Sequence, residues 1–501
     1  MYSRLFFIFS NALLFLLLFA GCSGRGDSYP IYDVNGETGY EAEGRTVDTG
    51  NELILTVLGH EIYYPIIELA QNTMNRAFAN QGIGQSIAID FTSYNRDTRD
   101  DVYMRLGVMF MAGQGYDMFF WDYRHPFRNY ARNGFLTDIY ELIDNDPDIN
   151  RDDFFTNVLE AYEYKGGLYV LPLTFGFSYV GINARLPQYI IDDFITYEFI
   201  TIDTLLSMYN NIRHEHFTDF GHLNLTVGSV HWNPQFLFQI MAGSFIDFNN
   251  NVSKLNSPGF VGNLHNFTQA FDVAAMEWET VFFTEAPHMM RFNQFIESHA
   301  FVTLCNMLNP AAAFFTAIDP SFLHIIPLVD KYGRLMIIPP QSSRSATGVA
   351  LCFPTAGDSN LAWEFSRHVF RAVLQYDGQV NVDNIQALGS FGNNTLATPI
   401  LRDYFLSHVM RTLNRVATLP SGGMIRSEGL HRNIGTRSEV IESAMHRIWE
   451  LSHMPVAVME MNLPDVLTQG DLINQLMTNV RTPESFAQEA HNRLSLWFIE
   501  Q

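Results

Sequence analysis

The stretch YEYKGGLYVLPLTFGFSYVGIN, residues 162–183, decides how we divide the chain. It begins with Lys165-Gly166-Gly167, a turn that predicts a tight hairpin. Residues 168–173 and 175–182 follow as apolar, β-rich runs, and the second is aromatic and contains glycines. Such a run is typical of a buried strand that another backbone or a ligand approaches closely. We therefore predict that the chain passes here from one lobe to a second, with a ligand cleft between them.

Length and charge narrow the class of protein. At 501 residues the chain is too long for one ordinary core, so two or three domains are expected. Charged residues make up 17% and hydrophobic residues 47%, which indicates a globular chain. The net charge of −23 argues against nucleic acid as a partner, because nucleic-acid binding needs basic patches.

The N-terminal segment, residues 1–22, has the pattern of an export signal. Arg4 precedes an apolar run over residues 5–20 that is too short for a typical membrane-spanning helix. The run ends Phe19-Ala20-Gly21-Cys22, which resembles the bacterial lipobox and implies that Cys22 is lipidated. A plain N-terminal membrane anchor is the alternative. Residues 23–51 are polar and predict a flexible tether.

Strand and helix patterns alternate in the next part of the chain. Residues 53–58, 86–94 and 116–121 predict strands, and residues 64–78 and 99–111 predict amphipathic helices between them. This alternation predicts an α/β lobe with parallel strands and right-handed crossovers. Ligands in such sheets bind outside the carboxyl ends of the strands.

That rule selects the candidate ligand residues of the first lobe. Glu61 lies in the loop after the first strand and Asn95 follows the second, while Trp121 ends the third strand and Asp122 and Arg124 follow it. An aromatic face, carboxylates, an amide and a guanidinium suit a polyhydroxylated ligand. The alternative is that these are ordinary surface loops.

Three motifs in this region resemble the family 1 extracellular solute-binding proteins, the sugar-binding lipoproteins of ABC importers. They are Ala112–Asp117 (AGQGYD), Gly134–Asp138 (GFLTD) and Lys165–Pro172 (KGGLYVLP). The helical segment 358–370 and the terminal segment 481–489, with Thr482 as its N-cap, are similar to further segments of that family. The resemblance implies a two-lobed, type II periplasmic-binding-protein-like α/β fold with a hinge between the lobes.

The resemblance also favours residues of the second lobe and the hinge. His231, Trp232 and Asn233 stand at a strand-to-helix corner, where the family's second lobe carries an aromatic platform, although Trp232 could instead be a core residue. Asn306 falls at another ligand corner, and Phe175 and Tyr179 would line the hinge. The implied domains are a first lobe, 52–174 with 346–392 returning to it, and a second lobe, 175–345 completed by 393–501.

Enzyme and metal interpretations find little support in the sequence. No motif of a serine hydrolase, metalloprotease, P-loop or dinucleotide site is present, and the Asp pairs stand in polar stretches. His214, His216, His222 and His231 form the densest histidine group, so a metal site there stays an alternative. Their spacing argues against it, because it is not that of two ligands on one helix face. Cys305 and Cys352 are expected to be buried free thiols rather than a disulfide.

We therefore expect a monomeric, non-enzymatic lipoprotein, held outside the bacterial cell membrane, without cofactor or metal. Its ligand would be a sugar or oligosaccharide, bound between closing lobes and passed to the subunits of an ABC permease. A lipoprotein that senses its ligand for a membrane kinase, a secreted glycoside hydrolase, and a receptor for peptides, polyamines or metals remain alternatives.

Overall fold

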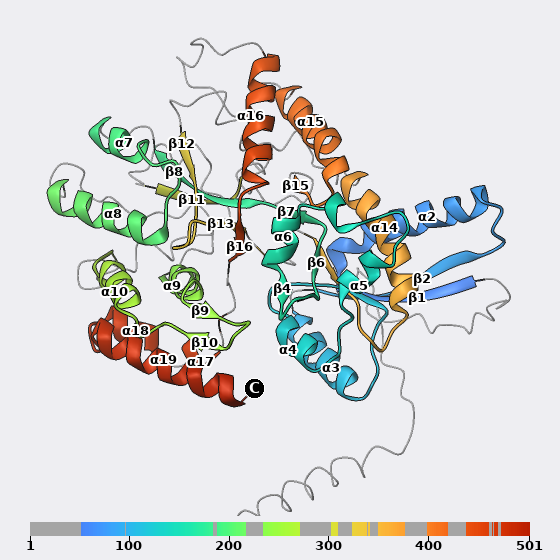
Figure 1. Cartoon of the computed structure of the whole chain (residues 1–501), viewed down its shortest axis with the longest axis horizontal. Helices are drawn as coiled ribbons and strands as arrows, with labels where there is room; N and C mark the ends of the chain where they lie inside the picture. Colours follow the sequence, from blue (N-terminus) through green and yellow to red (C-terminus); the bar gives the residue numbers. More distant parts are fainter. Residues whose placement is uncertain are drawn as a thin grey trace, which may run out of the picture. The chain divides into compact units, whose positions relative to one another are not determined.

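A five-stranded sheet organises the first half of the protein, as the computed structural model shows (Figure 1). The structure describes residues 52–95, 97–183, 188–216, 234–270, 302–308, 323–337, 339–340, 349–375, 398–418, 437–459, 463, 465–468 and 472–500. The sheet order is β2-β1-β3-β14-β6. Its strands are β1 (Glu52–His60), β2 (Ser86–Tyr94), β3 (Met118–Phe120), β14 (Ala350–Cys352) and β6 (Leu171–Pro172).

The strand directions in this sheet follow the alternation in the sequence. β1 and β3 are parallel, with Val57 opposite Met118, as expected for strands joined through helices. β14 is antiparallel to both β3 and β6. The segment expected to return to the first lobe, residues 346–392, thus supplies β14 to this sheet.

Helices cover this sheet and close the first core cluster, which is built around Val57, Phe119 and Leu351. They are α2 (Tyr64–Asn80), α3 (Arg99–Met111), α4 (Phe127–Arg132), α5 (Ile139–Asp144), α6 (Thr156–Ala161) and α14 (Ser359–Gln375), with short 3-10 helices at Glu61–Tyr63 and Arg151–Asp153. α14 packs on α2 (Figure 1). The Oδ1 atom of Asp358 accepts a hydrogen bond from the Leu361 N–H at 3.0 Å, so Asp358 caps this helix.

The stretch that opened the sequence analysis forms a hairpin and then the passage between two cores. β4 (Glu163–Tyr164) pairs with β5 (Gly167–Leu168), and the turn residues Lys165 and Gly166 have φ values of 52° and 85°. Positive φ at both turn residues is the geometry of a two-residue hairpin turn, so the hairpin is confirmed. β7 (Thr174–Phe175) pairs with β15 (Thr398–Pro399), and β8 (Phe177–Asn183) continues the chain.

β8 connects the two cores. Phe177 and Tyr179 belong to the first core cluster, whereas Val180 belongs to the second, which is built around Phe238, Phe260 and Leu476. The sheet around β8 has the order β11-β8-β13-β16, and β12 also pairs with β8. These strands are β11 (Val302–Leu308), β12 (Leu323–Pro327), β13 (Leu335–Ile337) and β16 (Val456–Val458).

Helices and a second hairpin complete this part of the chain. The helices are α7 (Gln188–Phe194), α8 (Ile202–His216), α9 (Pro234–Gly243), α10 (Pro258–Ala270), α17 (Asp465–Thr468), α18 (Leu472–Met477) and α19 (Pro483–Glu500). The hairpin pairs β9 (Ile246–Asp247) with β10 (Val252–Ser253). Thr482 accepts a hydrogen bond from the Ser485 N–H at 3.3 Å, so it caps α19 as predicted.

Two helices near the C-terminus pack on the first core cluster. α15 (Arg402–Thr418) and α16 (Arg437–Leu451) contribute Phe405, Val409 and Ile448 to the first core cluster. The sequence division placed residues 393–501 in the second lobe. An amphipathic helix shows that it has a buried face but not which of two cores that face meets. The lobe boundaries stay a prediction.

Some expected elements lie outside the described residues, namely the signal segment with Cys22, the tether, and the strand-to-helix corner at His231–Asn233. Within the described part of the chain, no helix combines the length and apolar character needed to cross a membrane.

Candidate functional site

The carboxyl ends of β1, β2 and β3 meet through a chain of aromatic side chains. The His60 ring, at the end of β1, lies edge-on to the Tyr94 ring, at the end of β2, with 5.5 Å between centroids. The Tyr94 and Tyr103 hydroxyls are 3.1 Å apart, and the Tyr103 ring centroid is 3.6 Å from that of His125 in the loop after β3. We call this cluster, with Glu61 and the loop 121–125, the strand-end site.

The loop 121–125 is ordered by its own hydrogen bonds. The Asp122 N–H donates to His125 Nδ1 at 3.1 Å, and the Arg124 N–H donates to Asp122 Oδ1 at 3.0 Å. The Trp121 indole N–H donates to the His125 carbonyl oxygen at 3.3 Å. This short loop therefore has a defined shape before any ligand binds, which lowers the entropic cost of binding.

Tyr123 and Arg124 form the outward-facing part of the loop. The Arg124 Nε–H donates to the Tyr123 hydroxyl at 2.9 Å, and the guanidinium lies 5.1 Å from the centre of the Tyr123 ring. Arg124 is exposed and Tyr123 is partly exposed. An aromatic face beside a guanidinium can stack on a sugar ring and donate hydrogen bonds to its hydroxyls. Tyr123 lies in the loop that the strand-end rule selects, although the contact residues chosen in that loop were its neighbours Asp122 and Arg124.

Burial controls the charge of the groups beneath this loop. It lowers the pKa of His125 to about 3, and burial is also the main reason that the pKa of His60 lies below its ordinary value. Burial, with a smaller contribution from the Asp122 carboxylate, raises the pKa of Tyr123 to about 12. At neutral pH both imidazoles are therefore neutral hydrogen-bonding groups, and Tyr123 keeps its proton.

Trp121 packs as a core residue. Its side chain is 3% exposed, and its ring lies edge-on to Phe127 and Tyr162 at centroid distances of 5.6 and 6.1 Å. No wide ring face is left for a sugar, so Tyr123 is the better platform in this loop. A ligand role for Trp121 stays a prediction. Asp122 is also buried, at 1% exposure, and accepts the Arg124 N–H.

Glu61 and Asn95 lie at the expected strand ends. Glu61 is exposed, directly after His60. The Asn95 side-chain oxygen accepts hydrogen bonds from the N–H groups of Asp97 and Thr98, at 2.9 and 3.1 Å. These bonds hold the turn before α3 and occupy the side-chain oxygen of Asn95. The side-chain amide nitrogen takes no part in them and can donate to a ligand.

Phe175 and Tyr179, which were expected to line the hinge, are buried in the first core cluster. Phe175 and Tyr179 are each 1% exposed, and the Phe175 ring packs edge-on to Phe155 and Phe177 at 5.5 Å. Asn306 lies in β11, where the backbone is described. His231, Trp232, Asn233 and Cys22 lie outside the described residues. The ligand roles of all these residues stay predictions.

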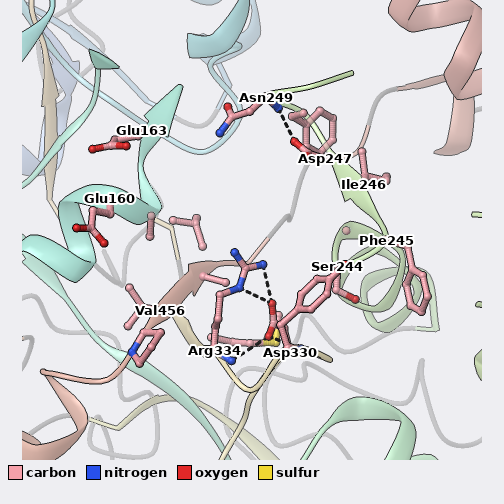
Figure 2. A pocket seen from close by; sticks show the side chains of 18 of the residues that line it. Glu160, Glu163, Ser244, Phe245, Ile246, Asp247, Asn249, Asp330, Arg334 and Val456 are labelled. Atoms are coloured by element: carbon pink, nitrogen blue, oxygen red, sulfur yellow. Dashed lines mark hydrogen bonds and ion pairs between the residues drawn. The ribbon is translucent and has the colours of Figure 1, made fainter. Parts of the chain in front are cut away.

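A separate pocket of about 550 Å³ lies among α6, the β9–β10 hairpin, β13 and β16 (Figure 2). Figure 2 shows Glu160 and Glu163 on one side and the Asp330–Arg334 pair on another. Arg334 Nη2 lies 2.7 Å from Asp330 Oδ2, and Asp330 is 4% exposed. The pocket is polar enough to hold a small hydrophilic molecule.

None of the ligand residues selected from the sequence lines this pocket. Its walls come from segments far apart in the sequence, so no local motif marks it. The turn Asp330-Lys331-Tyr332-Gly333, with Gly333 at a φ of 78°, is the one readable signal, since such residues predict a tight turn. Among the described residues, no group of three or more His, Cys, Asp or Glu side chains could hold a metal ion.

Solved structures share this fold. The cyclic alpha-maltosyl-1,6-maltose binding protein from Arthrobacter globiformis matches with a TM-score of 0.51 and 12% identity, over 90% of this chain and 100% of its own. UspC from M. tuberculosis matches with a TM-score of 0.51 and 12% identity, over 89% and 100%. A Synechococcus sp. MITs9220 protein described as an oligosaccharide periplasmic-binding protein matches with a TM-score of 0.53 and 13% identity, over 89% and 99%.

Sequence comparison adds no closer relative: no protein-family model matches the chain, and no curated protein matches it. At identities of 12–13%, the structural likeness establishes the fold. The fold expected from the sequence motifs is confirmed. The chain has the α/β fold of the two-lobed periplasmic-binding proteins.

Proposed function

We propose that the protein captures a carbohydrate, in particular an oligosaccharide, outside the cell membrane and delivers it to an ABC importer. The observation that carries the proposal is the meeting of three strand ends in one site that combines aromatic rings with neutral and charged hydrogen-bonding groups. Ligands of this fold class bind at that edge of the sheet. The Arthrobacter globiformis neighbour, which binds a cyclic maltosyl-maltose, supports the ligand class.

In this proposal Tyr123 offers a ring face, and Arg124, Glu61 and the Asn95 amide offer hydrogen bonds. Trp232 and Asn306 would contact the ligand from the second lobe. A ligand that touches both lobes stabilises the closed state, because its affinity for that state is higher. The protein would bind the sugar without cleaving it.

A thermal-shift screen of the purified protein against a carbohydrate panel tests this function. A ligand at about 100 times its dissociation constant should stabilise the fold by about 2.7 kcal/mol. Chromatography of the recovered sugar should show it unchanged. No stabilisation by any sugar in a folded sample would contradict the ligand class, and cleaved product would indicate a hydrolase.

The position of the ligand is tested by two tyrosine variants. Tyr123→Ala should weaken binding of the sugar found in the screen, whereas Tyr332→Ala, in the wall of the separate pocket, should leave its affinity unchanged. The reverse result would move the ligand to the pocket.

The membrane anchor is a further part of the proposal. Cys22 would carry the lipid, so Cys22→Ser should move the protein from the membrane fraction to the soluble fraction. A Cys22→Ser protein that stays in the membrane fraction would favour an uncleaved N-terminal helix as the anchor.

A further inference from the structure

The His125 imidazole lies at the centre of the strand-end site but does not face solvent. The side chain is 2% exposed and is packed between two rings, with its centroid 3.6 Å from that of Tyr103 and 5.3 Å from that of Phe119. A group in this position cannot stack on a ligand without large rearrangement. Its polar atoms are therefore available only for contacts inside the protein.

The Nδ1 atom of His125 makes the contact that shapes the loop. It accepts the hydrogen bond from the Asp122 N–H at 3.1 Å, so this nitrogen carries no proton. The Asp122 N–H is buried, and a buried donor without an acceptor costs about 1–3 kcal/mol. The imidazole thus favours the one loop conformation in which this donor is satisfied.

The backbone of His125 fixes the loop on both sides. Its carbonyl oxygen accepts hydrogen bonds from the Trp121 indole N–H at 3.3 Å and from the Phe127 N–H at 2.8 Å. Its own N–H donates to the Asp122 carbonyl oxygen at 2.8 Å. One residue therefore links the end of β3 to the start of α4.

The orientation of Tyr123 and Arg124 depends on the hydrogen bond from the Asp122 N–H to His125 Nδ1. With the Asp122 backbone held by His125, Asp122 Oδ1 accepts the Arg124 N–H at 3.0 Å. The Tyr123 N–H donates to the Pro340 carbonyl oxygen at 3.0 Å. Both exposed residues are thus fixed at the backbone, and the Arg124 Nε–H bond to the Tyr123 hydroxyl joins their side chains.

We propose that His125 is a positioning residue for ligand binding: through Nδ1 it holds the loop 121–125 in the conformation that presents Tyr123 and Arg124 to a carbohydrate. The proposal rests on the proposed function for its ligand, whereas the loop conformation can be measured without one. His125 itself makes no contact with the sugar. It acts by reducing the number of loop conformations that binding must exclude.

Two isosteric variants separate this role from general packing. His125→Asn places an amide oxygen near the position of Nδ1, whereas His125→Gln places its amide near the position of Nε2. Both put a polar side chain into the same buried site, so their costs to folding are comparable. Only the first can accept the Asp122 N–H in the native geometry.

The readouts are backbone hydrogen exchange at Asp122 and Arg124, Trp121 fluorescence, and affinity for the sugar found in the carbohydrate screen. In the His125→Gln protein we expect faster hydrogen exchange at the amides of Asp122 and Arg124. We also expect the sugar to bind about tenfold more weakly, which corresponds to the loss of one hydrogen bond worth about 1.4 kcal/mol. We expect His125→Asn to stay within about threefold of the wild type in affinity, less than 1 kcal/mol. Equal affinities and exchange rates for the two variants would overturn the proposal.

Failure of the proposed function can be distinguished from failure of the role proposed for His125. If the wild-type protein binds no sugar, the exchange and fluorescence measurements still test whether His125 holds the loop. If neither variant folds, the wild-type protein is measured alone. The Asp122 amide should then be strongly protected from exchange, and rapid exchange there would overturn the proposal.

Discussion

The Oδ1 atom of Asp138 accepts a hydrogen bond from the Leu168 N–H at 2.9 Å. The same atom accepts the Tyr140 N–H at 3.0 Å and so caps α5. Asp138 ends the Gly134–Asp138 motif, and Leu168 belongs to the Lys165–Pro172 motif, thirty residues further along the chain. Two of the motifs that suggested the family therefore meet in space, and the carboxylate joins a helix to a hairpin.

Asp138→Ala should lower the free energy of unfolding by about 1–3 kcal/mol, because it removes a helix cap and leaves a buried N–H of the hairpin without an acceptor. Urea unfolding followed by circular dichroism measures the change. Asp192→Ala is the matched control, since Asp192 is exposed and accepts a hydrogen bond from Gln188 of the same helix at 2.8 Å. An equal effect of the two substitutions would contradict the structural role of Asp138.

Two glycine substitutions, Gly357→Ala and a control in α10, test the contact between Asp117 and the start of α14. Asp117 accepts hydrogen bonds at 2.7 Å from the Thr56 N–H and the Asp358 N–H. A Cβ atom on Gly357 would lie 2.5 Å from the Asp117 Cα atom, so Gly357→Ala should destabilise the fold. Gly262→Ala, in α10 with open space around the new methyl group, should stabilise it by about 0.4–1 kcal/mol. Melting temperatures that shift in the same direction would contradict this contact.

The motifs that suggested the family can be read in the sequence, but the partners of their aspartates cannot, because Thr56 lies 61 residues from Asp117 and Leu168 lies 30 residues from Asp138. Asp117 and Asp138 end short motifs, and each accepts backbone N–H groups that any sequence with this fold must satisfy. The capped helices and the hairpin turn follow from the same kind of signal.

The candidate site was harder to predict, because loop residues do not follow the alternation of a strand. Trp121 and Tyr123 stand two positions apart, yet one ring packs in the core and the other is partly exposed. The hydrogen bond from the Asp122 N–H to His125 decides that arrangement, and no pattern in the sequence marks it. The separate pocket combines residues from 128 to 458, which only the folded chain brings together.

The two aromatic residues of the loop should therefore respond differently to truncation. Tyr123→Ala should weaken carbohydrate binding by about 1–3 kcal/mol with little change in melting temperature, since its ring is partly exposed. Trp121→Ala should instead lower the free energy of unfolding by about 3–5 kcal/mol, the usual cost of removing a buried aromatic ring. Calorimetric titration and urea unfolding measure the two quantities. Normal binding by a folded Tyr123→Ala protein would remove Tyr123 from the site.

Stability should fall in acid through His125, whose pKa burial lowers to about 3 in the folded protein. The ordinary pKa of histidine is about 6.5, so below that pH the unfolded chain binds a proton that the folded chain does not. This difference removes about 1.4 kcal/mol of stability per pH unit between pH 6.5 and about 3, and little above pH 6.5. His125→Asn should show a shallower loss between pH 6 and 4. Parallel curves for the two proteins would show that His125 does not titrate as proposed.

A cation–π contact in the wall of the separate pocket joins Arg128 of α4 to Phe248, which packs against the second core cluster. The Arg128 guanidinium lies 4.6 Å from the centre of the Phe248 ring, and that ring packs edge-on to Phe498 at 6.1 Å. A double-mutant cycle of Arg128→Ala and Phe248→Ala should give a coupling energy of about 0.5–2 kcal/mol in unfolding experiments. Arg128 has other partners, and the cycle removes their contributions because they are the same with and without the Phe248 ring. Arg128→Lys keeps the positive charge and should retain part of the coupling. Additive effects of the two substitutions would mean that the contact contributes nothing to stability.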